Sequence, residues 1–378
     1  MNMYERTNKI SMLLERIVEE LDIPESLYLQ AKNRYESVGD WLSKDDSPLT
    51  IYNPEIYPQG SFLLGTVIKP ISNKDEYDID LVCFLADLDK SETSQSELKN
   101  IVGARLKEND TYKKLLDEEG RRCWTLNYAN EFHMDILPAI ADLDLQKRGG
   151  LHQDAILITD KKKIDQGDVD WPKSNPKGYA RWFFSRQEVI YMAIKKQLAD
   201  LLKASIDDVP NYKVKTPLQR AIQVLKRHRD FFFSRKHSEY KPISIIINTL
   251  AAKIYQGQEN IYSAIYDILQ TINEDIVKQN GNFSIENPVN QDENFADKWN
   301  ENEKLPLAFF DWINSARDTF CRDVLKKEKD LEMMDVLKEN LGVNIKIDVN
   351  FGQNEKSSKA EYSTNNIIIK NPSKPWCF

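Results

Sequence analysis

Hydrophobic residues recur with two different periods along this chain. Helical spacing covers residues 8–21 and 25–43, and Pro24 suits the start of the second of these helices. An alternating pattern then predicts strands at 78–85, 123–129, 132–138 and 155–159, with a helix at 95–108. Helical spacing returns over 178–203, 217–233, 242–256, 259–273 and 306–340. This order predicts an α+β protein in which a mixed-sheet lobe precedes a mainly helical lobe.

Two acidic residues share one face of the predicted strand at 78–85. Alternation places Asp78 and Asp80 on the same side, where two carboxylates repel each other and burial raises the cost of their charge. We therefore expect divalent cations between them. Upstream, Gly60-Ser61 is typical of a turn whose backbone N–H groups approach phosphate oxygens. The alternative is a turn followed by two solvent-facing aspartates.

The D-x-D spacing alone does not distinguish a metal site from a pair of solvent-facing aspartates. It recurs in this acidic chain at Asp87/Asp89, Asp142/Asp144 and Asp168/Asp170. A third carboxylate, Asp135, lies in the predicted strand at 132–138. If that strand lies beside the first, three carboxylates meet at one edge of a sheet and offer the oxygen ligands that Mg²⁺ or Mn²⁺ prefers. The alternative role for Asp135 is a hydrogen bond at the end of a strand.

Basic residues gather near these carboxylates in the sequence and again in the second half. Lys69 and Lys74 flank the first strand, and Lys226, Arg227 and Arg229 lie together in the predicted helix at 217–233. Such clusters are typical of a solvated face. Helical spacing places Lys226 at the margin of the apolar stripe formed by Ala221, Ile222, Leu225 and Phe232.

Ser244 follows Lys241-Pro242 and begins the next predicted helix. A helix start can bind phosphate through its free N–H groups, so Ser244 is a candidate nucleotide contact. The alternative is that Ser244 acts only as a helix cap.

The motifs resemble those of a known family. Gly60-Ser61, Asp78-x-Asp80 and the later Asp135 are similar to the signature of the polymerase-beta-like nucleotidyltransferases. Within that superfamily, the segments Gln59 to Thr66 and Asp75 to Val82 resemble those of the bacterial cGAS/DncV-like nucleotidyltransferases. The resemblance extends over residues 50–255.

This resemblance implies a bilobal fold, with a catalytic lobe at 1–165 and a mainly helical lobe at 166–378 that completes the nucleotide pocket. It implies that Asp78, Asp80 and Asp135 hold two Mg²⁺ (or Mn²⁺) ions and are catalytic. The nucleotide contacts that we expect are Gln59, Gly60, Ser61, Lys226 and Ser244. The implied activity joins nucleoside triphosphates, ATP or GTP, into a cyclic di- or trinucleotide with release of pyrophosphate. Relatives of this kind signal to a downstream effector in antiphage defence, and a regulatory protein partner is consistent with that role.

Composition and charge limit the class of protein, its expected location and the ligands that it binds. Hydrophobic residues make up 41% of the 378 residues and charged residues 30%, which fits a folded enzyme. No apolar run approaches the roughly 20 residues that span a bilayer, and the N-terminus has no secretory signal, so we expect a cytoplasmic protein. The four cysteines show no C-x-x-C spacing. A net charge of -8 disfavours binding to long nucleic acid but is compatible with small nucleotides.

Two other functions stay open at this point. One is a non-cyclising nucleotidyltransferase that acts on RNA, a protein or a small acceptor with the same three carboxylates. The other is a catalytically silent nucleotide sensor or antitoxin-like module that keeps the fold. The intact glycine, serine and aspartates disfavour the silent module.

Overall fold

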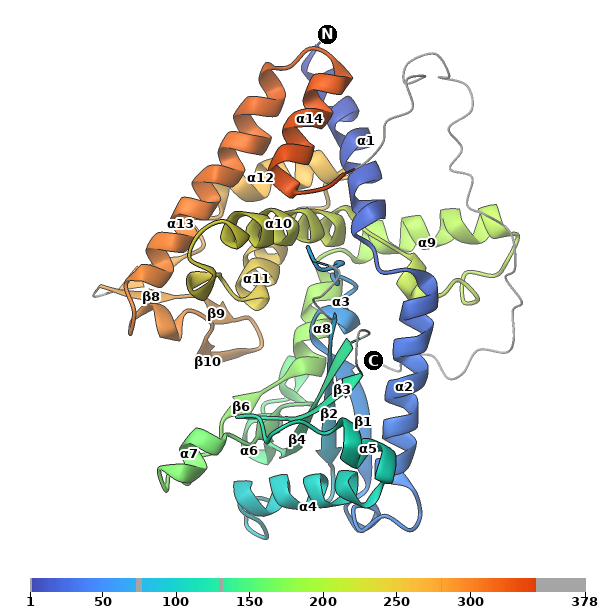
Figure 1. Cartoon of the computed structure of the whole chain (residues 1–378), viewed down its shortest axis with the longest axis vertical. Coiled ribbons are helices and arrows are strands. Elements are labelled where there is room, and N and C mark those ends of the chain that lie inside the picture. Colours follow the sequence, from blue (N-terminus) through green and yellow to red (C-terminus); the bar gives the residue numbers. More distant parts are fainter. Residues whose placement is uncertain (1, 73–76, 129–131, 280, 345–378) are drawn as a thin grey trace.

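The computed structural model describes residues 2–72, 77–128, 132–279 and 281–344. Figure 1 shows a lower lobe built around a twisted sheet and an upper lobe built almost entirely of helices. Lys74, which flanks the predicted strand, residues 75 and 76 of the aspartate motif and the segment from residue 345 onward lie outside the described residues.

The lower lobe consists of one mixed sheet with helices packed against it. Its strands are β1 (Pro54–Gln59), β2 (Tyr77–Leu85), β3 (Trp124–Tyr128), β4 (Phe132–Ala141), β5 (Ile156–Ile158) and β6 (Lys173–Ser174). The main strand order is β1-β2-β4-β5-β6, and β3 pairs with β4. Among the described strands of this sheet, β2 and β4 form the single parallel pair. The helices of this part are α2 (Glu25–Ser43), α3 (Gly60–Leu64), α4 (Gln95–Glu108), α5 (Asp110–Leu115), α6 (Leu143–Gln146) and α7 (Lys161–Asp165).

The two faces of the sheet have different roles. One face of β2 carries Ile79, Leu81 and Cys83, which are buried in a core with residues of α2 and α4. Because side chains alternate along a strand, Asp78 and Asp80 point to the opposite face. The predicted strand and its amphipathic face therefore agree with the structure, apart from shifts of one or two residues at the ends.

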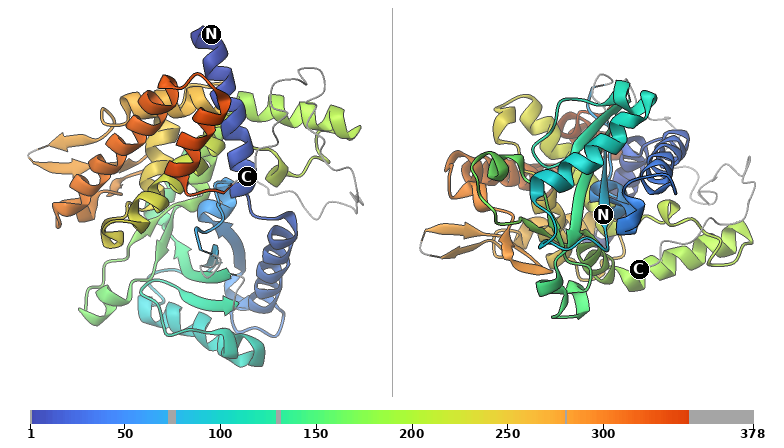
Figure 2. Two further views of the ribbon diagram at one scale, coloured as in Figure 1. Left: turned by 45° about the horizontal axis from the view of Figure 1, so that its top comes forward. Right: turned by 90° about the horizontal axis from the view of Figure 1, so that it is seen from below.

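The upper lobe has a core of its own. Its main helices are α1 (Met3–Leu21), α8 (Pro176–Ser185), α9 (Glu188–Leu202), α10 (Pro217–Ser234), α11 (Ser244–Ile254), α12 (Ile261–Thr271), α13 (Lys304–Arg317) and α14 (Asp330–Leu341). Residues of α1 belong to the same core cluster as residues of α10, α12 and α14, although α1 precedes the sheet in sequence. Helix α2 then runs down beside the sheet next to β1, as Figure 1 and the left view of Figure 2 show.

Two long predicted helices are each broken in the structure. The stretch 178–203 divides into α8 and α9, because Gln187 leaves the helical region (φ -131°, ψ 9°). The preceding Arg186 keeps helical dihedral angles, and its guanidinium donates to the carbonyls of Ala252 and Tyr255. The stretch 306–340 divides into α13, a π-helical turn, a 3-10 turn and α14. Apolar spacing continues through both breaks, so only the tertiary contacts reveal them.

Short strands in the upper lobe were not expected from the pattern. They are β7 (Val277–Gln279), β8 (Asn282–Ser284), β9 (Glu286–Asn287) and β10 (Asn290–Asn294), and they form two small antiparallel pairs. None of the helices in the described ranges combines the length and the apolar content that crossing a bilayer requires.

Candidate active site

The parallel pairing of β2 and β4 brings the three predicted carboxylates together. In the register of this pair, Asp80 lies opposite Asp135, and Asp78 lies opposite His133. All four residues occupy the same face, since each strand alternates and the register pairs like-facing positions. We call Asp78, Asp80 and Asp135 the carboxylate row.

A glycine corner closes one side of this row. Strand β1 pairs with β2 so that Gln59 lies opposite Asp80, and Gly60 follows at the start of α3. Gly60 has a φ of +63°, and a Cβ atom there would collide with the carboxylate of Asp80. Ser61 is the next residue in α3. Gln59, Gly60 and Ser61 therefore adjoin the carboxylate row as the sequence predicted.

The carboxylates of the row make it harder for one another to ionise. Burial, followed by the neighbouring charges of Asp135 and Asp78, raises the pKa of Asp80 to about 7. Burial and then Asp135 also raise the pKa of Asp78. Within the described ranges, none of the three forms an ion pair. A site of this kind is stabilised by a cation.

The donor atoms suit a hard divalent ion. They are carboxylate oxygens, and the nearby thiol of Cys123 stays protonated because burial and then Asp135 raise its pKa to about 11. Within the described part of the chain, no group of three or more His, Cys, Asp or Glu side chains is arranged so that it could hold a metal ion. The raised pKa values and the oxygen donors nevertheless fit Mg²⁺ or Mn²⁺.

The basic cluster of α10 is buried, and the expectation of a solvated face was wrong. Lys226, Arg227 and Arg229 are each only 5% exposed, because α10 runs through the centre of the upper lobe. The Nζ of Lys226 donates to the carbonyl of Thr66 over 2.9 Å. Burial, with a smaller effect of Arg229, lowers the pKa of Lys226 to about 7, while Asp78 and Asp80 act in the opposite direction. Lys226 is thus electrostatically coupled to the carboxylate row.

Ser244 is the first residue of α11, but it is not the cap. Ile243 occupies the N-cap position and provides no side-chain hydrogen bond, so the alternative of a capping serine was wrong. The Oγ of Ser244 instead accepts a 3.0 Å hydrogen bond from Arg229 Nη1, which also donates to the carbonyl of Pro242. Arg229 therefore fixes the start of this helix.

Sequence reasoning missed several polar residues around the row. Arg229 lies three residues after Lys226, so helical spacing was a usable signal for their shared side. Lys241 acts on Asp78 and opposes the rise in its pKa. On β3, Thr125 lies opposite Asp135 and Asn127 opposite His133. Alternation along 123–129 placed Thr125 and Asn127 on one face, but only the pairing shows which face.

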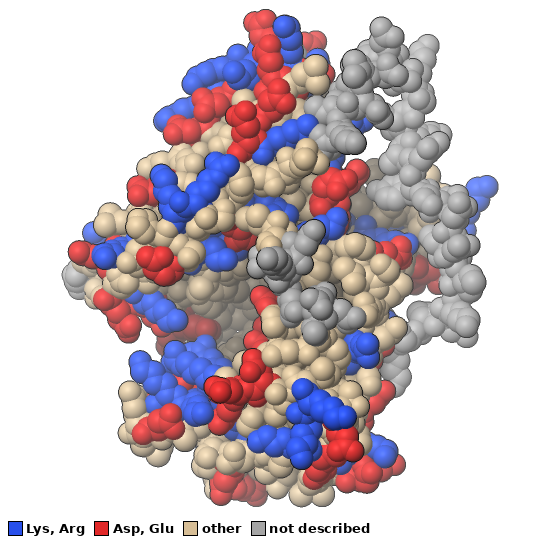
Figure 3. Space-filling view, in the orientation of Figure 1, with Lys and Arg blue, Asp and Glu red and all other residues tan. Residues whose placement is uncertain are grey.

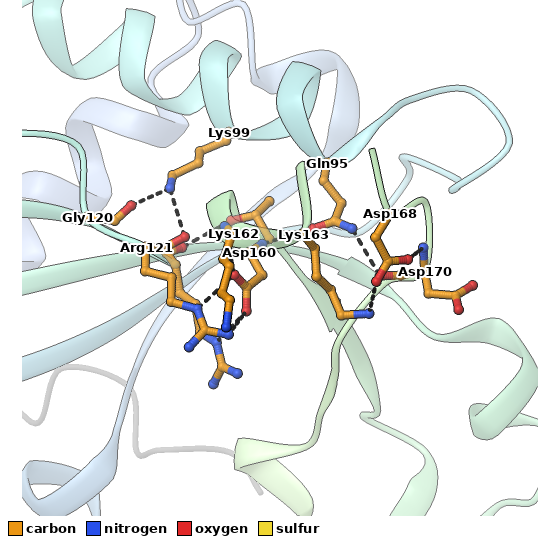
Figure 4. Close-up of polar contacts among 11 residues, drawn as sticks. Gln95, Lys99, Gly120, Arg121, Asp160, Lys162, Lys163, Asp168 and Asp170 are labelled. Carbon is orange, nitrogen blue, oxygen red and sulfur yellow. Dashed lines mark hydrogen bonds and ion pairs between the residues drawn. The ribbon is translucent and has the colours of Figure 1, made fainter. Parts of the chain in front are cut away.

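A second polar cluster lies at the edge of the lower lobe. The Asp160 network consists of Lys99, Glu119, Arg121, Arg122, Asp160 and Lys161. Arg121 binds both carboxylate oxygens of Asp160 over 2.8 and 2.7 Å, and the buried Lys99 pairs with Glu119 at 3.1 Å. Figure 4 shows Lys99 also reaching the backbone carbonyls of Gly120 and Arg121. In this network each acid has a basic partner.

The space-filling view places a hollow between the two lobes. Acidic and basic side chains both lie along its edge in Figure 3. A separate cavity of about 1030 Å³ lies between α1, α2, α9 and α10, with Tyr28, Phe62 and Tyr212 in its wall. This cavity includes none of the carboxylate row, so it is not the candidate active site.

Comparison with known proteins identifies the family. Residues 54–138 match the model of the "Cyclic GMP-AMP synthase DncV-like, nucleotidyltransferase domain", a range that contains the glycine corner and the carboxylate row. The chain is 32% identical over 321 residues to a c-di-GMP synthase of Roseivirga ehrenbergii, covering 84% of this chain and 80% of that protein. The chain belongs to the cGAS/DncV-like nucleotidyltransferases.

Further similarities agree with this family. The chain is 25% identical over 309 residues to the cyclic dinucleotide synthase CdnG of Bradyrhizobium diazoefficiens, covering 78% of this chain and 71% of that protein. The solved structure of CdnG in complex with GTP superposes with a TM-score of 0.64 at 19% identity, over 88% of this chain and 98% of that one. The expected fold and the nucleotidyltransferase class are confirmed.

Proposed function

We propose that this protein joins two nucleoside triphosphates into a cyclic dinucleotide, with GTP as its first candidate substrate. The observation that carries the proposal is the carboxylate row beside the Gly60 corner. Two relatives named as cyclic dinucleotide synthases, one of them a c-di-GMP synthase, support the product class. CdnG was also solved with GTP, which supports the choice of base.

Divalent metal is part of this proposal. We assign Asp78, Asp80 and Asp135 as the residues that hold two Mg²⁺ (or Mn²⁺) ions, because their pKa shifts and oxygen donors fit such ions. When bound, the metal supplies charge neutralisation at the phosphates and makes a ribose hydroxyl more acidic.

The remaining residues bind and align the substrates. At the Gly60 corner, the missing side chain lets the Asp80 carboxylate lie close to the backbone, and Gln59, Gly60 and Ser61 are the candidate phosphate contacts beside it. The Lys226 ammonium is a candidate partner for the terminal phosphates, and Arg229 holds Ser244 at the start of α11 for the same purpose. Catalysis then depends mainly on alignment and charge stabilisation.

The proposed reaction consists of two successive nucleotidyl transfers with the same chemistry. In each, a ribose hydroxyl oxygen forms a bond to an α-phosphorus, the bond from that phosphorus to the departing pyrophosphate breaks, and the hydroxyl proton is released. The second round closes the ring. The cyclic product is then available to a separate effector, and an antiphage role with a regulatory protein partner remains a proposal that rests on family membership.

A product assay tests the function. Purified protein is incubated with labelled ATP, GTP, CTP or UTP and Mg²⁺ or Mn²⁺, and the products are treated with phosphatase and separated. We expect a phosphatase-resistant cyclic dinucleotide, with the strongest signal from GTP. Linear or transferred label would indicate the non-cyclising enzyme, and no turnover would indicate the silent module.

The matched variants are Asp78→Asn with Asp80→Asn, and Asp87→Asn alone. Asp87 is exposed just beyond β2 and lies outside the carboxylate row. Product is expected to disappear in the double variant and to persist in the Asp87 variant. Synthesis retained by a folded double variant would falsify the assignment.

A further inference from the structure

Thr125 continues the carboxylate row onto a third strand. Strand β3 pairs with β4 so that Thr125 lies opposite Asp135, and β4 pairs on its other side with β2 so that Asp135 lies opposite Asp80. Three neighbouring strands therefore place Asp80, Asp135 and Thr125 side by side on one face. The sequence separation of these residues gives no hint of this order.

The hydroxyl of Thr125 makes a short hydrogen bond within this row. Its Oγ1 donates to Oδ1 of Asp135 over 2.5 Å. A length of about 2.5–2.7 Å is typical of an O–H donor to a charged carboxylate, which is a stronger bond than one between neutral groups. The thiol of Cys123 also hydrogen-bonds to Asp135, so Thr125 supplies the hydroxyl contact among the side chains that orient this carboxylate.

We propose that Thr125 is a positioning residue that fixes Asp135 in the orientation needed to bind a divalent cation. This inference rests on the proposed function, because it deepens the role of the same site. Thr125 itself neither binds the metal nor contacts the substrate in this proposal. It acts through Asp135.

The physical argument begins with repulsion among the acids. Asp80 lies opposite Asp135 on the neighbouring strand and Asp78 shares the same face, so repulsion between the like charges favours an Asp135 side chain that turns away from them when no cation is bound. The Thr125 bond opposes that movement. It engages one lone pair on Oδ1, and a carboxylate has further lone pairs that can bind a metal.

The choice of threonine is consistent with this role. A β-branched side chain has few χ1 rotamers and suits a strand, so its hydroxyl stays aimed at the neighbouring strand. Holding a ligand in place before the metal arrives reduces the ordering that binding must bring about. Residues that orient metal ligands in this way commonly change metal affinity by about 10- to 100-fold when they are replaced.

The test compares Thr125→Val with Thr125→Ser. Valine keeps the shape and the strand preference but removes the donor, whereas serine keeps the donor. Mn²⁺ binding to the nucleotide-free protein is followed by the electron paramagnetic resonance signal of free Mn²⁺, so the readout does not depend on activity. We expect about 10- to 100-fold weaker Mn²⁺ binding in the valine variant and affinity within about threefold of wild type in the serine variant.

A second readout separates positioning from a purely structural role. In the synthesis assay, the valine variant is expected to need a higher Mg²⁺ concentration and to recover most of its rate when Mg²⁺ is saturating. Thr111→Val is the matched control, because Thr111 is exposed in α5 and lies away from the row. It is expected to match wild type in both measurements.

The outcomes keep this inference distinct from the proposed function. If wild type makes no cyclic product, yet binds Mn²⁺ through Asp135 and loses affinity in the valine variant, the function fails and the inference stands. Unchanged Mn²⁺ affinity in a folded valine variant overturns the inference, and so does wild-type Mn²⁺ binding that survives Asp135→Asn. If circular dichroism shows the valine variant to be misfolded, Thr125→Ala takes its place with the same two expectations.

Discussion

The carboxylate row and the Asp160 network belong to the same lobe but treat their acids in opposite ways. Within the described residues, the row holds three acids with no ion pair, and the pKa values of Asp78 and Asp80 are raised. In the network, burial by itself would raise the pKa of Asp160, but hydrogen bonds and charge from Arg121 and Arg122 lower it. The acids of the Asp160 network are therefore paired with basic side chains, whereas the acids of the carboxylate row have no ion-pair partner among the described residues.

This difference in compensation indicates which of the two acidic clusters is expected to bind a cation. A charge held in the interior is tolerated when a neighbour compensates it. Asp160 is 1% exposed and compensated, so it requires nothing from solution. Ionised Asp80 has no such ion-pair compensation among the described residues, so its buried charge stays unfavourable in free energy until a cation binds. Cation binding relieves this penalty, which makes the row a candidate binding site.

The largest effect is expected from removing a charge in the row. Asp80→Asn should reduce synthesis by at least about 10³-fold, since it loses a proposed metal ligand. The same change should stabilise the metal-free protein at pH 8. The folded pKa of Asp80, about 7, exceeds its unfolded value, so this group lowers the free energy of unfolding as pH rises from about 4 to about 7.

Melting temperatures in the presence of EDTA measure this second effect. The gain at pH 8 should be on the order of 2–4 kcal/mol and should vanish near pH 4, where Asp80 is protonated in both states. A variant that is less stable than wild type at pH 8 would show that the row is compensated like the network.

The next effect comes from the glycine corner. Gly60→Ala should reduce synthesis by about 10²-fold, because the new Cβ displaces the Asp80 carboxylate and the positive φ adds strain. Gly149→Ala is the control, since Gly149 has a similar φ of +67° and no atom within 4 Å of the added Cβ. Gly149→Ala therefore has the backbone strain of an alanine at positive φ but no steric clash of the new Cβ atom. Equal activity of the two variants would remove the proposed role of the corner.

The Asp160 network should respond through stability. Asp160→Asn leaves Arg121 and Arg122 without their counter-charge and should lower the free energy of unfolding at pH 7 by about 1–3 kcal/mol, a value discounted for the half-exposed arginines. The lowered folded pKa means that wild type loses this advantage as pH falls through that value.

Urea denaturation at pH 7 and pH 3 measures this difference. Asp168→Asn is the control, because the side chains of its pair with Lys163 are 32% and 37% exposed, so the pair should have less influence than one that is buried. A stabilising effect of Asp160→Asn at pH 7 would contradict the view that this network is compensated.

The smallest effect is expected at the buried cation facing the row. Lys226→Met should raise the KM for GTP about tenfold at pH 6.5, where the ammonium is charged. Burial lowers the pKa of Lys226 to about 7, so the wild-type KM should rise as pH increases through that value and approach that of the variant. Lys196→Met, on the exposed side of α9, should leave the KM unchanged. A pH-independent ratio between the two KM values would argue against a charge contact.

Local features of the fold were predictable because they depend on neighbours in sequence. The helix at 95–108 and the strand at 78–85 follow from apolar periodicity, and alternation alone placed Asp78 and Asp80 on one face. The break between α8 and α9 was not predictable, since it accompanies contacts that are distant in sequence: the backbone leaves the helical region at Gln187, and the guanidinium of the preceding Arg186 binds carbonyls more than 60 residues away. The burial of Lys226 and Arg229 was missed for the same reason.

The sequence by itself determined the class of the fold, the identity of the three acids and the glycine beside them. Tertiary structure alone decided that β4 lies parallel to β2, which aligns Asp135 with Asp80, and that β3 adds Thr125 to the row. The physical reason is that periodicity records which face of an element is buried. Which strands become neighbours depends on how the whole chain packs.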